Sequence, residues 1–273
     1  MKTTIIIVTY NSLSKIKKNF DNLFKNQNLK IFIIDNNSTD QTVNHISSTF
    51  PNIKIFKQKS NLGYGRACNI GLKKVQSEYS LILNPDVKIS YNDIQVFEKI
   101  ISINQNVFLL GPTFTDDKYY NNNLINTNWI SGCVMFINNK YLNKIGLFDE
   151  NIFLFFEESD LCLRTINNKY LIYKCSDIRV SHNRGDSCEN TIEIVKMKSW
   201  HYGWSWSYYN TKYNLKSKIA LKKRYFIYLI KSFFYLSKIK KVKYYYSAKG
   251  VKAFINKRDA FVNGRPILDN GIY

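Results

Sequence analysis

The chain lacks the cysteine spacing that zinc sites and disulfide-rich domains use. Its cysteines form no Cys-x-x-Cys pair, and their number is odd. This pattern argues against a structural zinc site and a disulfide framework, and it favours a reducing compartment. The five cysteines are Cys68, Cys133, Cys162, Cys175 and Cys188.

The chain also lacks a long apolar run. No stretch reaches the roughly 18 uncharged apolar residues that a membrane-spanning helix needs. The N-terminal run Ile5-Ile6-Ile7-Val8 is too short for the core of a signal peptide, and polar Thr9-Tyr10-Asn11 follow it at once. We therefore predict that the chain begins with a buried strand.

Acidic residues are scarce. Lys and Arg number 40 and Asp and Glu only 20, which gives a formal net charge of +20 over 273 residues. Such an excess favours an anionic partner, which is nucleic acid, a phosphate-bearing substrate or an acidic membrane face, unless it reflects only a compositional bias toward lysine. Apolar residues make up 45%, enough for a large folded domain with a smaller appendage.

The first half of the chain alternates strand and helix patterns, which predicts an α/β fold with a mostly parallel sheet flanked by helices. The second half is less regular, and we found no internal repeat. The predicted strands cover 3–8, 30–34, 53–56, 79–83, 129–137 and 178–180, and the predicted helices cover 14–24, a segment opening at 38–40, 66–74 and 157–167.

Polar side chains follow three of these strands. Thr9 and Asn11 come after the first, Asp35 and Asn36 after the second, and Asp86 after the fourth. Because parallel sheets bind ligands beyond the carboxyl ends of their strands, we expect these residues to line a ligand site.

Five segments followed by a sixth resemble, in their order, family 2 glycosyltransferases of the GT-A fold, especially the bacterial rhamnosyltransferase-like branch. The resemblance covers about residues 3–187 and implies inverting transfer of a sugar from a nucleoside diphosphate. The segments are IIIVTYNS, IIDNNSTDQT, NLGYGRACNIG, LILNPDV, FDENIFLFFEESDLCLR and SHNRGDS.

The resemblance assigns the donor nucleotide to the first three segments. It implies that Asp35 accepts a hydrogen bond from the pyrimidine base, since a carboxylate is an acceptor-only group, and that Thr9, Asn11 and Asn36 line the same pocket. The alternative is that Asp35 is a turn acid.

The loop of the third segment is implied to pass along the nucleotide through Asn61, Gly63, Arg66 and Asn69. Arg66 is either a phosphate contact or a solvated surface arginine, and Gly63 gives the backbone freedom to turn.

Asn84-Pro85-Asp86 stands where the family has its metal-binding Asp-x-Asp. The resemblance implies a Mg²⁺ or Mn²⁺ ion that offsets the charge of the departing diphosphate, with Asp86 as a ligand. Asn84 replaces the first aspartate, and His182 matches a family histidine that can complete the site. The alternatives are an ordinary turn and a structural histidine.

Glu157-Glu158-Ser159-Asp160 stands where the family has its general base. The resemblance places the base at Glu158, with Asp160 as the rival and as a partner for Arg164. Trp129, Ser131 and Gly132 resemble the segment that faces the acceptor, although a tryptophan of the core is the alternative.

Beyond Trp200 the composition shifts toward Tyr, Phe, Trp and Lys. We divide the chain into a GT-A domain at 1–210 and a helical appendage at 211–273. Basic residues interrupt the apolar pattern of 216–257, which favours lying on an anionic bilayer over spanning it. The alternative is a packing appendage with solvated lysines.

We therefore expect a metal-dependent inverting hexosyltransferase, peripheral on the cytoplasmic face of a bacterial plasma membrane. Its donor is a dTDP- or UDP-linked sugar, with a deoxysugar such as rhamnose favoured, and its acceptor is a hydroxyl of a lipid-linked surface glycan such as an O-antigen. The rivals are a nucleic-acid-binding protein, for which no recognised module is present, and a non-catalytic relative of the fold.

Overall fold

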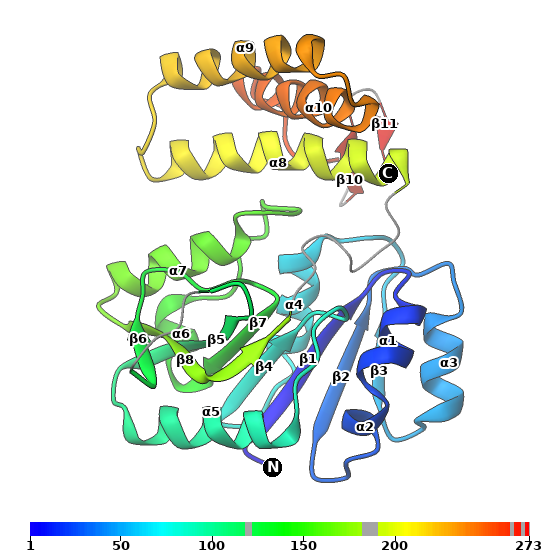
Figure 1. Ribbon diagram of the computed structural model, residues 1–273, viewed down its shortest axis with the longest axis vertical. Helices are drawn as coiled ribbons and strands as arrows, with labels where there is room; N and C mark the ends of the chain where they lie inside the picture. The colour runs from blue at the N-terminus through cyan, green and yellow to red at the C-terminus, as the bar shows by residue number, and fades with distance from the viewer. Residues whose placement is uncertain (118–121, 182–190, 263–264, 269–270, 273) are drawn as a thin grey trace. The chain divides into compact units, whose positions relative to one another are not determined.

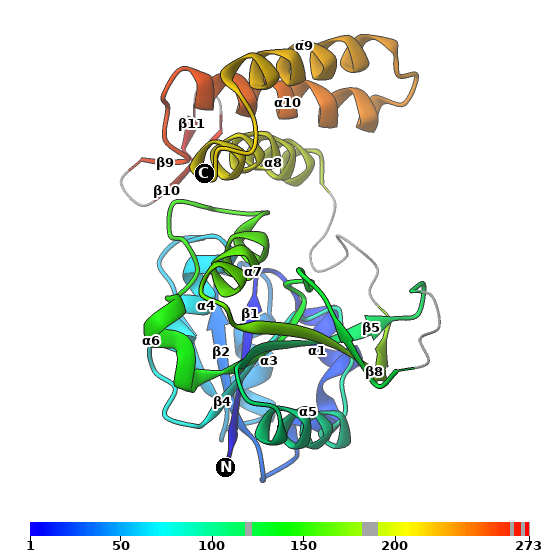
Figure 2. The same cartoon turned by 90° about the vertical axis from the view of Figure 1, so that its left-hand side faces the viewer.

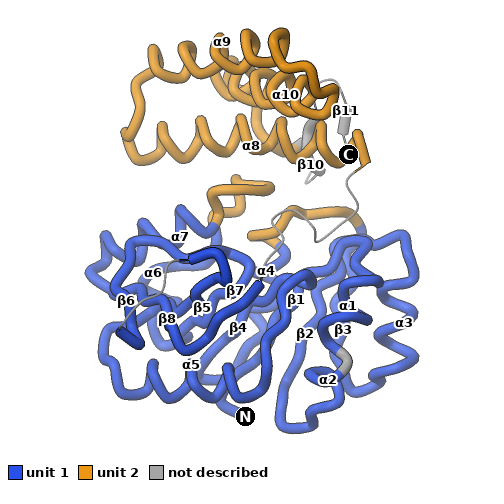
Figure 3. Tube along the Cα trace, in the orientation of Figure 1, with its two compact units in different colours: residues 1–59, 67–148, 158–188 blue, residues 60–66, 149–157, 189–273 orange. Residues whose placement is uncertain are grey.

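The computed structural model describes residues 1–117, 122–181, 191–262, 265–268 and 271–272. The chain divides into two compact units, which are coloured separately in Figure 3. Unit 1 is Met1–Lys59, Ala67–Phe148 and Glu158–Cys188, and unit 2 is Ser60–Arg66, Asp149–Glu157 and Glu189–Tyr273.

Unit 1 is built on an eight-stranded mixed sheet (Figure 1). β1 pairs in parallel with both β2 and β4, and β2 pairs in parallel with β3, whereas β7 is antiparallel to β4 and β5. In spatial order the strands are β3 (Lys54–Lys57), β2 (Lys30–Asp35), β1 (Thr3–Thr9), β4 (Tyr79–Leu83), β7 (Val134–Asn138), β5 (Val107–Phe114), β8 (Leu171–Val180) and β6 (Leu124–Asn126).

Helices connect and flank these strands, as the alternating pattern predicted. Ser90 is the N-cap of α5 (Tyr91–Ile103), and it forms a reciprocal capping box with Asp93. These bonds satisfy two of the free N–H groups at the start of the helix. The helices are α1 (Leu13–Asn19), α2 (Asp21–Phe24), α3 (Thr42–Thr49), α4 (Tyr64–Leu72), α5 (Tyr91–Ile103), the 3₁₀ helix η1 (Asn139–Tyr141), α6 (Leu142–Ile145) and α7 (Glu157–Asn167).

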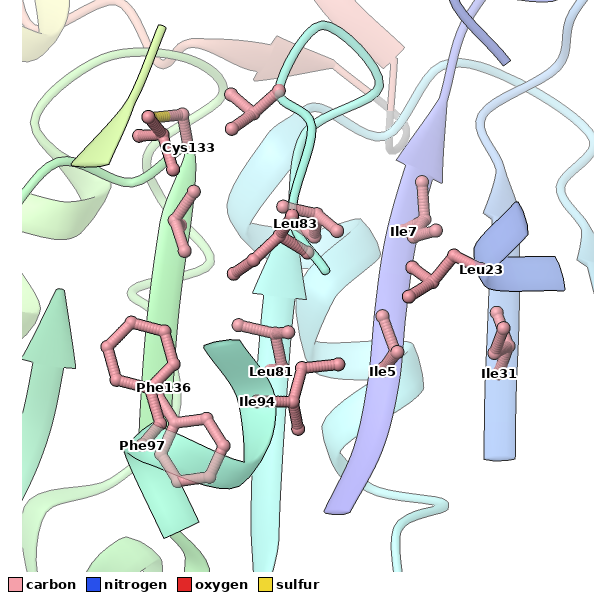
Figure 4. Packing of buried hydrophobic residues seen from close by; sticks show 14 of the residues in the cluster. Ile5, Ile7, Leu23, Ile31, Leu81, Leu83, Ile94, Phe97, Cys133 and Phe136 are labelled. Carbon is pink, nitrogen blue, oxygen red and sulfur yellow. The ribbon is translucent and has the colours of Figure 1, made fainter. Parts of the chain in front are cut away.

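The core of unit 1 lies between the sheet and its helices. Every residue of β1 is buried, as expected for a central strand covered on both faces. Ile5 and Ile7 belong to the cluster that Figure 4 shows, whereas Ile6 faces Gly71 of α4. In the same cluster the Phe97 ring of α5 stacks on Phe136 of β7 at 5.2 Å between centroids.

The predicted strands of the first half and the helix at 157–167 are confirmed to within a residue or two. The helix predicted from Ser14 instead has Ser12 at its N-cap position and is interrupted after Asn19. Beyond β4, the strands β5 and β6 were not predicted, and β8 is longer than predicted. The strand predicted from Trp129 begins only at Val134, because the residues before it form a turn.

Unit 2 consists mainly of three helices, α8 (Ile192–Lys212), α9 (Lys218–Phe234) and α10 (Lys238–Ile255). Thr191, Ser217 and Ser237 cap them, each accepting a hydrogen bond from a backbone N–H three residues on. α10 packs against both α8 and α9 (Figure 2). A small antiparallel sheet contains β9 (Phe261–Val262), β10 (Arg265–Leu268) and β11 (Gly271–Ile272).

Two glycines allow α8 and α10 to approach closely. A Cβ atom on Gly250 would collide with the Trp200 carbonyl oxygen, and one on Gly203 would collide with the Ser247 carbonyl oxygen. Trp200 and Trp204 are buried beside this contact with Ala253. Bare backbone at both positions therefore sets the separation of the two helices.

The domain boundary predicted at residue 210 falls inside α8, which continues to Lys212. A distinct role for residues 211–273 stays a prediction. In the part of the chain that the structure describes, no helix combines the length and the apolar character that crossing a membrane requires.

We predict that Gly250→Ala destabilises the protein. Alanine favours a helix over glycine by about 1 kcal/mol, but backbone atoms of α8 occupy the space of the new methyl group, and overpacking costs about 1–3 kcal/mol. Because the clash is with backbone atoms, we place the cost at the upper end of this range, so the free energy of unfolding in urea should fall by about 2 kcal/mol. Lys252→Ala, on the exposed face of the same helix, is the control and should have little effect. An equally stable Gly250→Ala variant would contradict this packing.

Candidate active site

The ends of β1 and β2 lie side by side and carry the residues that are predicted to bind the pyrimidine of the nucleotide. Thr9 pairs with Asp35 in the register of the two strands. The Thr9 hydroxyl donates to Asp35 Oδ1 at 3.0 Å, and the Ser38 backbone N–H donates to Oδ2 at 3.0 Å. The Asn36 N–H donates to the Thr9 carbonyl at 2.8 Å. Asp35 is fully buried and fixes the turn after β2, so its contact with a base stays a prediction.

Asn11 joins this turn to the loop after β1. Its backbone has a positive φ of 50°, which asparagine adopts more readily than most residues. Its side-chain oxygen accepts from the Thr39 N–H at 2.8 Å, and its own N–H donates to the Ser38 hydroxyl at 2.9 Å. The two loops at this edge are therefore held together by polar side chains.

The loop at residues 61–66 is held within unit 2. Gly63 has a φ of 84°, and a side chain there would collide with the Phe153 carbonyl. Asn61 accepts from the Gly63 N–H at 3.0 Å. Arg66 donates to the Glu150 carbonyl at 2.6 Å and stacks on Phe261. A phosphate contact by Arg66 stays a prediction.

Two features of its surroundings shift the pKa of Arg66 in opposite directions. Its burial lowers the pKa of the guanidinium, and the nearby carboxylates of Glu150 and Asp149 raise it. The positive charge of this arginine is thus partly offset by acidic neighbours in its own unit.

Asn69 of α4 clamps the chain at Phe148. Its amide nitrogen donates to the Phe148 carbonyl at 2.9 Å, and its oxygen accepts from the Phe148 N–H at 3.0 Å. Asn69 is buried, so these bonds fix the start of the segment that leads to α7. The structure shows this clamping, and the predicted nucleotide contact is untested.

The turn after β4 is anchored on both sides. The Asn84 N–H donates to the Cys133 carbonyl at 2.8 Å, and Asn19 of α1 donates to the Pro85 carbonyl at 2.8 Å. Asn84 Oδ1 is shielded from solvent and accepts no hydrogen bond from the residues described. The Asp86 carboxylate oxygens are shielded as well.

These oxygens suit a hard cation such as Mg²⁺, which proteins usually bind through one or two carboxylates together with substrate phosphates. Within the described ranges, no group of three His, Cys, Asp or Glu side chains forms a complete site. His182, the predicted additional ligand, lies outside the described residues. A cation here would therefore depend on Asp86 and on oxygens of the donor.

Glu158 lies in the first turn of α7 beside the predicted acceptor segment. The Trp129 indole N–H reaches Glu158 Oε1 at 3.3 Å and Ser159 Oγ at 3.1 Å, and the Ser159 hydroxyl donates to Glu158 Oε1 at 3.0 Å. Burial raises the pKa of the Glu158 carboxyl, and the hydrogen bonds from Ser159 and Trp129 lower it in part. A carboxylate with a raised pKa is a stronger base.

Asp160 is paired with Arg164 one turn further along α7, as the spacing predicted. Arg164 Nε donates to Asp160 Oδ2 at 2.8 Å, and the guanidinium also donates to the carbonyls of Ile145 and Leu147. Asp160 is fully buried. These contacts attach α7 to the segment after α6 and give Asp160 a structural role.

The backbone that leads into α7 is strained. Phe155 and Phe156 both have positive φ, 69° and 71°, in a region that bulky residues rarely adopt. Within unit 2 both rings contact Tyr202 of α8, at 5.6 and 5.7 Å between centroids. Glu157, which follows, is buried. The aromatic contacts therefore hold an unfavourable conformation next to the predicted base.

The predicted acceptor segment lies next to both Glu158 and the Asn84–Asp86 turn. Trp129 is 43% exposed, so it is not a core tryptophan. The Ser131 hydroxyl donates to Cys133 Sγ at 3.2 Å, and the Cys133 carbonyl accepts from Asn84. Gly132 lies between them in this turn. The residues predicted to bind the acceptor, to bind the metal and to act as the general base thus lie on neighbouring segments of unit 1.

A family profile described as "Glycosyl transferase family 2" matches residues 4–163, more than half of the chain. The chain belongs to glycosyl transferase family 2. The match contains all the predicted site residues of this glycosyltransferase except His182.

Curated relatives and solved structures agree with this assignment. The chain is 25% identical over 206 residues to the dTDP-rhamnosyl transferase RfbF of Shigella flexneri, covering 66% of this chain and 69% of the relative. It is 23% identical over 209 residues to the low-salt glycan biosynthesis hexosyltransferase Agl10 of Haloferax volcanii, covering 66% and 67%. The first match confirms, at low identity, the resemblance to rhamnosyltransferases.

The fold of this glycosyltransferase is GT-A. The mannosyltransferase PcManGT of Pyrobaculum calidifontis, solved with GDP-Man and Mn²⁺, superposes with a TM-score of 0.60 at 16% identity, covering 95% of this chain and 76% of that one. At this identity the likeness establishes the fold alone.

Sequence reasoning missed three residues that position this site. Asn19 holds the Asn84–Asp86 turn through the Pro85 carbonyl, the Ser38 backbone N–H donates to the Asp35 carboxylate, and the Ser159 hydroxyl donates to Glu158. The bond from the Ser38 N–H had a local signal, because Asp side chains in turns commonly accept from backbone N–H groups shortly after them in the chain. Asn19 had none, since its partner is 66 residues away.

We predict that Asp160→Asn destabilises this glycosyltransferase by about 2–3 kcal/mol, below the 3–5 kcal/mol typical of a fully buried pair because Arg164 is partly exposed. Urea unfolding measures the change. Asp117→Asn, which removes a more exposed pair with Lys174, is the control and should cost less than about 1 kcal/mol. A variant of Asp160 that is stable but inactive would make Asp160 the base.

Proposed function

We propose that this glycosyltransferase inverts the sugar that it transfers, in a single displacement with Glu158 as the general base. The supporting observation is the environment of Glu158: a carboxylate whose pKa burial raises, held by Ser159 and Trp129 beside the acceptor segment. Asp160 is the less suitable base, because it is fully buried and bound to Arg164.

In the proposed reaction, Glu158 takes the proton of an acceptor hydroxyl while that oxygen forms a bond to the anomeric carbon of the donor. The bond from this carbon to the diphosphate breaks, and the nucleoside diphosphate departs with the electron pair. Attack from the face opposite the leaving group inverts the anomeric configuration. Such a base contributes about 10²–10⁴-fold to the rate.

The donor is proposed to bind along the carboxyl edge of β1, β2 and β4. A carboxylate has about four acceptor positions, and the bonds from Thr9 and Ser38 leave some of those of Asp35 for a pyrimidine. Asn36 would line the same pocket, and Asp86 and Asn84 would hold Mg²⁺ or Mn²⁺. The ion would stabilise the charge of the leaving diphosphate.

The proposed donor is a dTDP- or UDP-linked sugar, with a deoxysugar such as rhamnose favoured by the Asn-Pro-Asp turn and by the likeness to RfbF. The proposed acceptor is a lipid-linked glycan, presented to the enzyme at the cytoplasmic face of an anionic membrane. Trp129 is suited to stack on a sugar of this acceptor, because its ring is partly exposed beside Glu158.

We predict that Glu158→Gln lowers turnover by about 10²–10⁴-fold while donor affinity stays within about twofold, because the base acts on the acceptor hydroxyl. Turnover is measured with a panel of nucleotide sugars and Mn²⁺, and donor affinity by calorimetry. Glu78→Gln changes an exposed carboxylate before β4 and should keep full activity. Near-normal turnover in a folded Glu158→Gln variant would refute the assignment.

We further predict that Trp129→Phe moves the acidic limb of the pH–rate profile upward. The Trp129 N–H stabilises the charged form of Glu158 and so lowers its pKa, which means that losing this bond raises the pKa further above its ordinary value. Activity then falls at a higher pH as the medium is acidified, while the plateau at high pH is kept. Ser159→Ala should shift the limb in the same direction. An unchanged midpoint in both variants would separate these residues from the base.

A further inference from the structure

The outward face of α9 is an apolar stripe with no protein partner in the described structure. Ile219, Phe226, Ile230 and Phe233 are all exposed, Phe233 by 77%. At about 100° per residue, positions separated by 7, 4 and 3 fall on one side of a helix. These four residues are called the outer stripe.

α9 therefore has apolar residues on two opposite sides. Its inner side buries Leu221 and Tyr228, and Tyr228 packs with Ala248 and Val251 of α10. A helix that needs only to cover a core has one apolar side and one polar side. The second apolar side thus needs a partner outside the unit.

The apolar surface continues past the end of α9. Phe234, the last residue of the helix, is exposed, and Leu236 in the turn before α10 is 99% exposed. Large apolar side chains gathered over one helix and its following turn are unusual on a protein that meets only water.

Charge shows which kind of partner fits. Lys222 and Lys223 lie about 50° to either side of the outer stripe, and both are exposed. No Asp or Glu occurs between residues 216 and 257. A second copy would bring two such basic surfaces together, which charge repulsion opposes, whereas an anionic surface is attracted.

We propose that α9 lies in the plane of an anionic bilayer, with the outer stripe and Leu236 inserted among the acyl chains and the lysines at the phosphates. Aliphatic Ile219, Ile230 and Leu236 favour lipid over nucleic acid, because they offer no flat ring on which bases stack. Lysine stems beside an inserted stripe can extend their charges to the headgroups.

This inference deepens the proposed function, since it names the surface on which a lipid-linked acceptor would be met. It also narrows the predicted membrane-binding surface from the basic region 216–257 to one face of α9. Binding is then attributed to insertion of apolar side chains as well as to charge attraction. Transfer is not part of its test, so that a failure of the proposed chemistry and a failure of the membrane surface are distinguishable.

The test is co-sedimentation of the full chain with vesicles of phosphatidylcholine, with and without about one third phosphatidylglycerol, free of donor and acceptor. Ile230→Ser/Phe233→Ser should weaken binding to the anionic vesicles by about tenfold or more, since even partial burial of two such side chains is worth that much. Ile103→Ser, at another exposed apolar residue, is the matched control and should bind like the unmodified chain.

Salt separates insertion from attraction. Lys222→Gln/Lys223→Gln should weaken binding mainly at low salt, because charge attraction is screened as salt rises. Residual binding of the unmodified chain at high salt should then disappear with the stripe variant. Binding that is abolished by salt alone, with the stripe variant equal to the unmodified chain, would overturn insertion.

Two other occupants have distinct signatures in the same set of variants. If the chain is a dimer in analytical ultracentrifugation and the stripe variant is monomeric, the stripe is a self-association surface and the proposal is wrong. If the stripe variant loses binding to a single-stranded oligonucleotide while no form of the chain binds vesicles, a nucleic acid is the occupant and the proposal is likewise wrong.

Discussion

The whole site depends on the complete burial of β1 between parallel neighbours. A strand whose seven residues are all buried must pair on both edges, and β1 does so with β2 and β4. Parallel pairing forces the three strands to end at the same edge of the sheet. Thr9, Asp35 and the Asn84–Asp86 turn are therefore neighbours because of the core, before any specific contact forms.

A smaller set of directional bonds converts this nearness into a defined arrangement. The carboxylate of Asp35 orders one turn, and Asn19 and Cys133 order the turn that carries Asp86. Arg164 attaches α7, the helix that carries Glu158, to the rest of unit 1 through the carbonyls of Ile145 and Leu147. Because the bonds of Asn19, Cys133 and the Arg164 guanidinium to backbone carbonyls join distant segments, the geometry of the site is a property of the folded chain and of no single motif.

This division explains which features the sequence could predict. Strands β1, β2 and β4 were readable because they are mostly apolar and are bounded by turns. The pairing of Asp160 with Arg164 was readable because it is local to one helix. β8 was mostly missed, because partly exposed Tyr173 and Lys174 interrupt its apolar pattern. The bond between Trp129 and Glu158 spans 29 residues and depends on a turn that was predicted as strand.

The positive charge of the chain does not by itself distinguish between the two anionic ligands proposed for it. A diphosphate donor and an anionic bilayer attract the same lysines and arginines, so net charge alone cannot direct either to its place. At the carboxyl edge, selectivity can come from acceptor groups and from carboxylates that would repel an anion unless a cation is bound with it. On α9 no acidic group is present, and the exposed Phe and Ile side chains can be buried by lipid acyl chains but not by a soluble phosphate. Net charge would thus attract both proposed ligands to the protein, and the short-range contacts at each place would decide which of them binds there.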